Sequence, residues 1–288
     1  MLISDKCITY TIKSHRLQLD GRESQDWSKI YSGKLKADMV IFGNCQALVG
    51  LDPSILSSDE NLCYNLSMNG YGFPLQKFKI EQFLENNEAP QAMVIALDFR
   101  ITQRRSMQLN PIQFLPELYF NEELYNGLRE YDFFNWKDLY IPLYRYTPFI
   151  PGFLKKNNSP PRVKDSYGHV KVNQSFKKSR FNKILDELYS KEIPSDDPDE
   201  LIEFILKMKQ KGIQIYTVAM PVLHYKLLNA VPEKTKNALR SNNIPFFELE
   251  SDHELIDQRY FYDEFHMNKI GSQLISEWLK TRIDQNWK

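Results

Sequence analysis

The chain has 288 residues, of which 42% are hydrophobic and 26% are charged, proportions that are ordinary for a globular protein. Its 37 basic residues (lysine and arginine) balance 37 acidic ones, so no net charge attracts a nucleic acid or an anionic membrane. The length suits one large α/β domain or two small ones.

The three cysteines, Cys7, Cys45 and Cys63, are sparse and odd in number, which argues against a disulfide framework. No CxxC pair indicates a structural zinc site. No apolar run reaches the roughly 18 residues of a membrane span, and residues 1–21 lack the apolar core of a signal peptide. We therefore expect no membrane span in this chain, while an anchor outside the given sequence stays an open alternative.

Apolar runs bounded by glycine, proline and asparagine predict strands that alternate with helices. Residues 1–33 are polar and are predicted to be irregular, apart from one short strand at 8–12. The other predicted strands are 37–42, 63–67, 92–99, 213–220 and 244–249. The predicted helices are 46–51, 74–87, 113–130, 181–190, 197–212, 226–242 and 268–283.

The clearest strand is 92–99, an almost unbroken apolar run of the kind that a parallel sheet buries on both faces. The clearest helix start is 197–200, where an acid, a proline and two further acids stand in capping order. Because strands alternate with helices, the sequence predicts an α/β fold with a parallel sheet covered by helices on both faces.

Residues 100–195 interrupt this alternation, because they are rich in tyrosine, phenylalanine, proline and asparagine. The stretch 151–171, PGFLKKNNSPPRVKDSYGHVK, is too long for a simple connection. We interpret 100–195 as an insertion or lid within one domain that spans 1–288. The aromatic residues between 113 and 149 suit stacking on sugar rings and equally suit packing onto the sheet.

Ligands of a parallel sheet bind at the carboxyl ends of its strands. The residues that follow predicted strands, and are therefore expected at this edge, are Cys45, Asn69–Gly70, Asp98–Arg100, Pro221–His224 and 260–266. Arg100 either holds an anionic group of the substrate or forms a surface ion pair. His224 either lines the cleft or is an ordinary loop histidine.

Two features at this edge suit nucleophilic catalysis. Residues 43–46, GNCQ, bend after an apolar strand and place Cys45 at the start of a predicted helix, where a thiol pKa falls. Asp263 and His266 have a spacing that puts both side chains on one side of a turn, so the acid orients the imidazole that takes the proton of Cys45. The plainer alternatives are a small turn residue at Cys45 and a surface histidine at His266.

Three blocks together resemble the SGNH/GDSL hydrolase superfamily: GNCQ at 43–46 with Gly50 and Asp52–Pro53, NLSxNG at 65–70, and DxxHxNxxG at 263–271. They are most similar to the bacterial branch whose first block reads G-[SN]-S-[RH]. The resemblance covers most of the chain outside 100–195. It implies a flavodoxin-like three-layer α/β/α fold with a central parallel sheet of about five strands.

The resemblance also implies hydrolysis or transfer of an O-acyl ester, from a small molecule or a glycan, without a metal or organic cofactor. It assigns Cys45 as the nucleophile in place of the family's serine, His266 as the base and Asp263 as the acid that orients it. The oxyanion hole falls to the backbone N–H groups of Cys45 and Gly70, with Asn69 as a substitute for the family's asparagine.

The chain departs from the family at Cys45 and at residues 96–100, ALDFR, which lack the asparagine expected after the third strand. Loss of one oxyanion donor costs about 10²–10³ in rate. A second hypothesis is therefore a catalytically inactive SGNH-like protein that binds a glycan or a partner. The resemblance indicates the periplasmic side of the cell envelope, whereas a functional thiol fits a cytoplasmic compartment, and the oligomeric state stays open.

Overall fold

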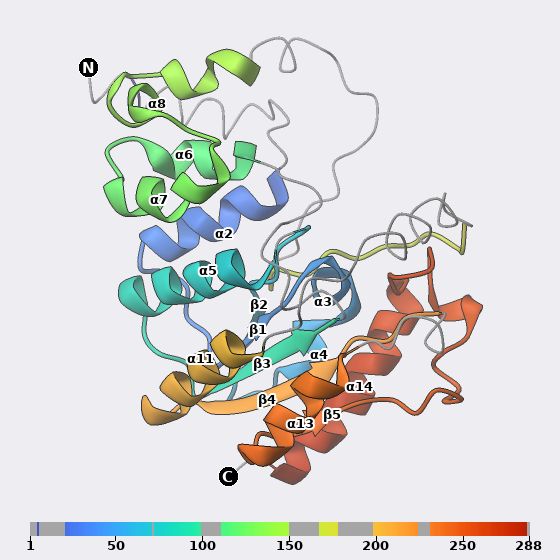
Figure 1. The fold of residues 1–288 in the computed structure, drawn as a ribbon. Coiled ribbons are helices and arrows are strands. Elements are labelled where there is room, and N and C mark those ends of the chain that lie inside the picture. The colour runs from blue at the N-terminus through green and yellow to red at the C-terminus, as the bar shows by residue number, and fades with distance from the viewer. Residues whose placement is uncertain are drawn as a thin grey trace. The chain divides into compact units, whose positions relative to one another are not determined.

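A computed structural model describes residue 5 and residues 21–70, 72–98, 111–149, 167–177, 198–223 and 231–286 of the chain (Figure 1). These residues form an α/β protein around one parallel sheet. Two predicted elements, the strand at 8–12 and the helix at 181–190, lie outside the described residues.

The sheet has five parallel strands in the order β2-β1-β3-β4-β5. Their bounds are β1 Met39–Phe42, β2 Cys63–Asn65, β3 Ala92–Leu97, β4 Gln214–Ala219 and β5 Phe246–Phe247. This is the flavodoxin-like strand order, which changes direction at the junction of β1 and β3. The predicted three-layer α/β/α fold is confirmed, and each strand overlaps a predicted one.

Helices connect these strands. The long ones around the sheet are α5 Phe73–Asn86, α11 Asp199–Gln210, α13 Glu233–Ser241 and α14 Lys269–Asn286. The short ones near it are α3 Cys45–Gly50, α4 Pro53–Leu56 and the 3₁₀ turn η4 Gln258–Tyr260. Among the described residues, no helix is long and apolar enough to cross a membrane.

The remaining helices are α2 Gly21–Tyr31, η1 Pro111–Phe114, α6 Leu115–Leu118, α7 Glu122–Gly127, η2 Arg129–Tyr131, α8 Trp136–Tyr140 and η3 Tyr144–Phe149. The chain divides into two compact units. The first holds Met1–Leu35, Glu81–Asn87 and Leu109–Lys164, and the second holds the sheet with Lys36–Ile80, Glu88–Gln108 and Asp165–Lys288. The described part of 100–195 therefore contributes to both units, and its interpretation as one insertion stays a prediction.

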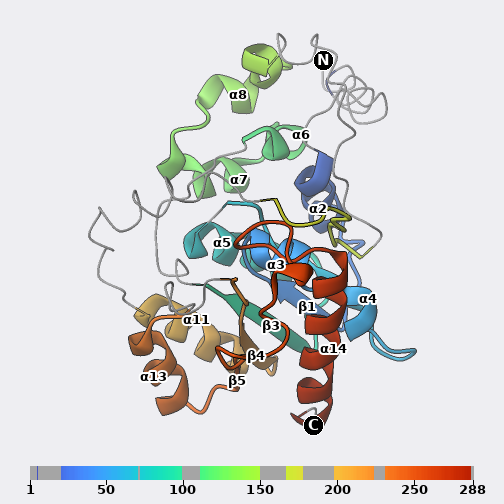
Figure 2. The same cartoon turned by 90° about the vertical axis from the view of Figure 1, so that its right-hand side faces the viewer.

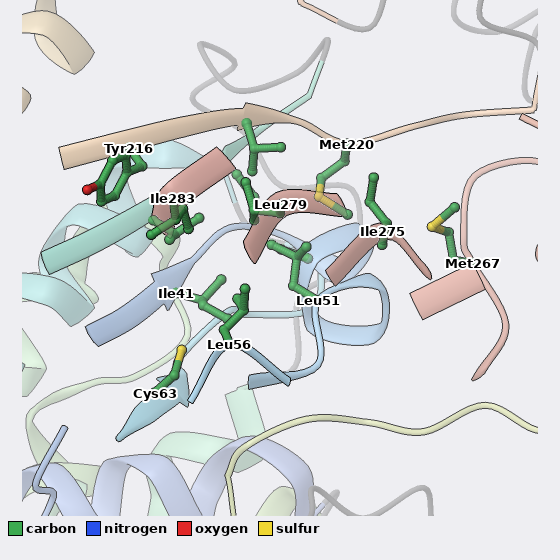
Figure 3. Packing of buried hydrophobic residues seen from close by; sticks show 14 of the residues in the cluster. Ile41, Leu51, Leu56, Cys63, Tyr216, Met220, Met267, Ile275, Leu279 and Ile283 are labelled. Carbon is green, nitrogen blue, oxygen red and sulfur yellow. The ribbon is translucent and has the colours of Figure 1, made fainter. Parts of the chain in front are cut away.

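Within the sheet unit, α11 and α14 lie on opposite sides of the strands (Figures 1 and 2). The α14 side is a continuous apolar layer in which Ile275 and Leu279 pack with Ile41 of β1 (Figure 3). Val40 and Phe42 alternate with Ile41 along the strand and are also buried, so both faces of β1 are covered. This explains why the sequence of the strand is apolar throughout.

Two element predictions in the first unit are wrong. Residues 21–31 form α2 instead of an irregular segment. The segment is mostly polar, but Trp27 and Ile30 lie three residues apart, on one face of the helix, and both are buried. The helix predicted at 113–130 is broken at Phe120, whose φ of 55° is left-handed and ends the helical run. Asn121 then caps the next helix, α7, by accepting a hydrogen bond from the N–H of Leu124.

Candidate active site

Cys45 lies on the tight turn between β1 and α3, at the carboxyl edge of the sheet. Asn44 caps α3, and Cys45 is the first residue of the helix. Gly43 has no room for a side chain, because a Cβ there would lie 2.6 Å from the Cβ of Ala47 and 2.9 Å from that of Ala96. The glycine therefore lets α3 approach β3 closely and fixes the point from which the thiol projects.

The side chain of Asn44 holds this turn from two sides. Its Oδ1 accepts a hydrogen bond from the backbone N–H of Gln46 at 2.8 Å, and its Nδ2 donates to the carboxylate of Asp98. Asn44 and Asp98 are both buried. The backbone around Cys45 is therefore tied to the end of β3 by contacts that solvent does not reach.

Asp263 and His266 form the pair that their spacing predicts. The Oδ1 atom of Asp263 accepts the backbone N–H groups of Phe265 and His266, each at 2.9 Å, which closes a tight turn. The Nδ1 atom of His266 lies 2.9 Å from Oδ1 and 3.0 Å from Oδ2 of Asp263. The carboxylate thus fixes both the turn and the orientation of the imidazole, leaving Nε2 for other contacts.

Cys45 and His266 interact with each other. Burial by itself lowers the pKa of His266, but the negative charge of Cys45 and the hydrogen bonds with Asp263 and Cys45 raise it well above its usual value. Burial raises the pKa of Asp263, but the hydrogen bond and positive charge of His266 lower it below its usual value. These two shifts favour an imidazolium at His266 and a carboxylate at Asp263, with the imidazolium next to the sulfur of Cys45. The structure thus brings together the three residues that the sequence proposes as a triad.

Aromatic rings fix the plane of the imidazole. The ring of Tyr262 stacks on that of His266 with centroids 5.4 Å apart and planes 12° apart. Phe265 approaches the same imidazole edge-on, at a centroid distance of 6.4 Å. The side chain of His266 is 19% exposed, so only a small part of it is open to solvent.

The rest of the DxxHxNxxG block has a structural role. Oδ1 of Asn268 accepts the N–H groups of Ile270 and Gly271 at 3.0 Å each, and its Nδ2 donates to the carbonyl of Arg259 at 2.7 Å. A Cβ at Gly271 would lie 2.2 Å from the carbonyl oxygen of Tyr260. Asn268 and Gly271 therefore start α14 and hold the loop of Asp263 and His266 against it.

Two of the predicted oxyanion residues, Asn69 and Gly70, lie in the loop after β2. The N–H of Met68 donates to the carbonyl of Gly43 at 2.9 Å, so this loop runs beside the turn that carries Cys45. Gly70 follows with a φ of 77°, which glycine adopts without strain. Asn69 and Gly70 thus directly follow a residue that is bonded to this turn, and their function as oxyanion donors stays a prediction.

Arg100 and His224, the two residues predicted to bind substrate, lie outside the described residues. Asp98 is described, and it follows β3 where the resemblance leads us to expect an asparagine. Its carboxylate binds Asn44 instead of presenting an N–H donor. In the described ranges, no three histidine, cysteine, aspartate or glutamate side chains are grouped so that they could hold a metal ion.

The sequence analysis missed His169, which lies in a buried serine–histidine–aspartate array. Its Nε2 is 3.1 Å from Oγ of Ser272 and 3.1 Å from the carbonyl oxygen of Val49, and its Nδ1 is 3.4 Å from Oδ2 of Asp52. A carbonyl can only accept, so Nε2 carries a hydrogen and cannot take the proton of the serine. His169 and Ser272 are also only 1% exposed, which closes the array to substrate. No local spacing indicates this array, because its members are far apart in the sequence.

Comparison with models of known protein families and with curated proteins finds no match to this chain.

Proposed function

We propose that the protein is an SGNH-like esterase or acyltransferase that acts on an O-acyl ester, of which an acetyl ester on a glycan is one form, with Cys45 as its nucleophile. The observation that carries the proposal is the series formed by Cys45, His266 and Asp263. The order of these residues along the chain, and their place at the carboxyl edge of a parallel sheet, resemble the superfamily and support the same assignment.

The proposed reaction begins with the thiolate of Cys45, which attacks the acyl carbon of the ester. His266, protonated and held by Asp263, gives its proton to the departing alkoxide, and a thioester remains on Cys45. The neutral imidazole then removes a proton from water or from an acceptor hydroxyl, which attacks the thioester. The acyl group leaves as a free acid or as a new ester, and the thiolate and imidazolium are restored.

Each step needs a donor for the oxyanion that forms on the acyl oxygen. In this proposal the N–H groups of Cys45 and Gly70 supply it, with Asn69 as the third donor. Negative charge develops on this oxygen in the transition state, so each hydrogen-bond donor that faces it raises the reaction rate by about 10²–10³-fold.

A second candidate function is that of a catalytically inactive binding protein of the same fold, and the position of Asp98 favours it. A buried carboxylate at the end of β3 offers no hydrogen to an oxyanion, and its negative charge opposes one. In this alternative the edge of the sheet binds a glycan or a partner without turnover.

Hydrolysis of short-chain p-nitrophenyl esters tests the proposal. The wild type is expected to turn over the acetyl ester, and Cys45→Ala and His266→Ala are each expected to lose about 10³-fold or more of kcat/KM. Cys63→Ala is the matched control, because it removes a buried thiol from the core and leaves the site intact. Mass spectrometry of rapidly quenched samples should find the acyl group on the Cys45 peptide.

Two outcomes oppose the esterase. Retention of full activity by Cys45→Ala places the chemistry elsewhere. An inert wild type, together with gain of turnover in Cys45→Ser, supports the inactive binding protein.

A further inference from the structure

Residues 167–177, here called the strap, form an extended segment that joins the separate parts of the candidate site. At its start, the carbonyl of Tyr167 accepts the N–H of Asn65, which ends β2, at 2.9 Å. The N–H of Val170 donates to the carbonyl of Leu48 in α3 at 3.2 Å. The strap is thus bonded to the helix that begins at Cys45.

The second half of the strap is bonded to the loop that carries the histidine. The carbonyl of Val172 accepts the N–H of Lys269 at the start of α14, at 2.8 Å. The N–H of Lys177 donates to the carbonyl of Tyr262 at 2.9 Å. One segment therefore connects the nucleophile helix to the loop of Asp263 and His266.

Apolar packing follows the same course. Val170 and Val172 of the strap form a buried cluster with Leu48 and Val49 of α3, and Tyr262 packs against this cluster. The ring of Tyr262 stacks in turn on the imidazole of His266. The ring of Tyr262 therefore contacts both the cluster that contains the strap valines and the imidazole of His266.

His169 anchors the strap. Its ring is buried and faces two acceptors on other elements, the carbonyl of Val49 in α3 and the carboxylate of Asp52 that caps α4. The ammonium group of Lys171 lies beside the same carboxylate, with its Nζ 3.6 Å from Oδ2 of Asp52.

The turn before His169 is shaped for this position. Gly168 has a φ of 83°, and a Cβ there would lie 2.3 Å from the carbonyl oxygen of Asn65. The strap therefore passes very close to the end of β2 before the histidine enters the protein. Displacement of His169 cannot be absorbed locally, because the chain on both sides of it is bonded to the site.

We propose that His169 is a positioning residue for the pair of Cys45 and His266: it fastens the strap to α3 and α4, and the strap holds Tyr262 against the imidazole. The inference rests on the proposed function for the reaction that this pair performs. A displacement of about 1 Å at a reacting group is enough to cost about 10²-fold in rate.

The test measures the rate at which iodoacetamide alkylates Cys45 as a function of pH, with each cysteine-containing peptide followed separately by mass spectrometry. In the wild type, the thiolate is paired with His266, so the midpoint lies well below the ordinary thiol value of about 8.5. His169→Phe replaces the imidazole with a ring that has no hydrogen-bond donor. It is expected to raise the midpoint of Cys45 alkylation by about one pH unit or more. His169→Gln returns an N–H donor near the position of Nε2 and is expected to restore part of this shift.

Thr217→Val is the matched control, because it removes a buried hydrogen bond of 2.7 Å to the carbonyl of Pro245, in a strand that carries neither Cys45 nor His266. Urea unfolding is measured for every variant. The control is expected to lower the free energy of unfolding and leave the alkylation midpoint unchanged. If His169→Phe does not fold, the alkylation midpoint of His169→Gln is compared with that of the wild type, and this comparison tests the positioning role.

A lower free energy of unfolding with an unchanged midpoint in the His169 variants overturns the positioning role and leaves the proposed function standing. An ordinary midpoint in the wild type overturns both. A shifted midpoint in the variants, combined with no ester turnover in the wild type, supports the positioning role and contradicts the esterase.

Discussion

The Nδ1 atom of His266 faces both carboxylate oxygens of Asp263, at 2.9 and 3.0 Å, and one of these oxygens also accepts the backbone N–H of His266 itself. The carboxylate therefore fixes the ring and the backbone of the same residue. The two residues are only three positions apart, which makes the pair visible in the sequence.

Asp263→Asn is expected to reduce kcat/KM by about 10³–10⁴, because an amide no longer stabilises the imidazolium and favours the wrong tautomer of the ring. The fold should persist, since the amide oxygen still accepts the N–H groups of Phe265 and His266. The measurement is ester hydrolysis, with circular dichroism to verify folding.

Asp257→Asn is the matched control for this substitution. Asp257 also accepts a backbone N–H two residues later, that of Arg259 at 2.8 Å, but it does not contact the histidine. Equal loss of activity in both variants would show that the loop, and not the imidazole pair, responds to the loss of charge.

Gly43→Ala is expected to lower the free energy of unfolding by about 1–3 kcal/mol, because its Cβ overlaps Ala47 and Ala96. It should also slow alkylation of Cys45, since α3 has to move away from β3. Gly212→Ala is the control: its φ of 83° strains the backbone, but nothing lies within 4 Å of the new Cβ. Gly212→Ala is expected to lower the free energy of unfolding by a comparable amount and to leave the alkylation rate of Cys45 unchanged. An unchanged alkylation rate in Gly43→Ala as well would contradict the packing argument.

Asp52 makes stability depend on pH. Burial raises its pKa, but the hydrogen bonds from His169 and Ser54 and the charge of His169 lower it below its usual value. The folded carboxylate thus binds a proton less tightly than the unfolded one, so it stabilises the fold above about pH 4 and loses this contribution as pH falls. Between pH 7 and pH 3, urea unfolding should show a larger loss of stability in the wild type than in Asp52→Asn.

Asp38→Asn is the control for that series, because Asp38 also accepts a backbone N–H, that of Leu62 at 2.8 Å, and lies away from His169. Parallel curves for the wild type and Asp52→Asn would contradict the linkage.

The parts of the site that the sequence reveals are those built from neighbouring residues. The bend at 43–46 follows a clear apolar strand, and Asp263 and His266 stand at turn spacing, so local rules identify both. The parallel sheet then places them at one edge, because strand ends in such a sheet share a direction. This reasoning predicts the fold class and the three proposed catalytic residues together.

The parts of the site that the sequence does not reveal are contacts between residues that are far apart in the chain. His169 contacts Val49, Asp52 and Ser272, and nothing in the neighbouring sequence distinguishes it from a surface histidine. The partner of Asn44 is similarly invisible, because Asp98 reaches it from another strand. Such contacts follow from the tertiary arrangement and have no periodic signature.

The interaction of Cys45 with His266 is the central claim, and the pH dependence of Cys45 alkylation tests it most directly in the wild type and His266→Ala. Because the charge of Cys45 raises the pKa of His266, the imidazolium reciprocally stabilises the thiolate. The account predicts a wild-type midpoint well below about 8.5 that returns toward this value in His266→Ala. An ordinary midpoint in the wild type that the substitution leaves unchanged would contradict it.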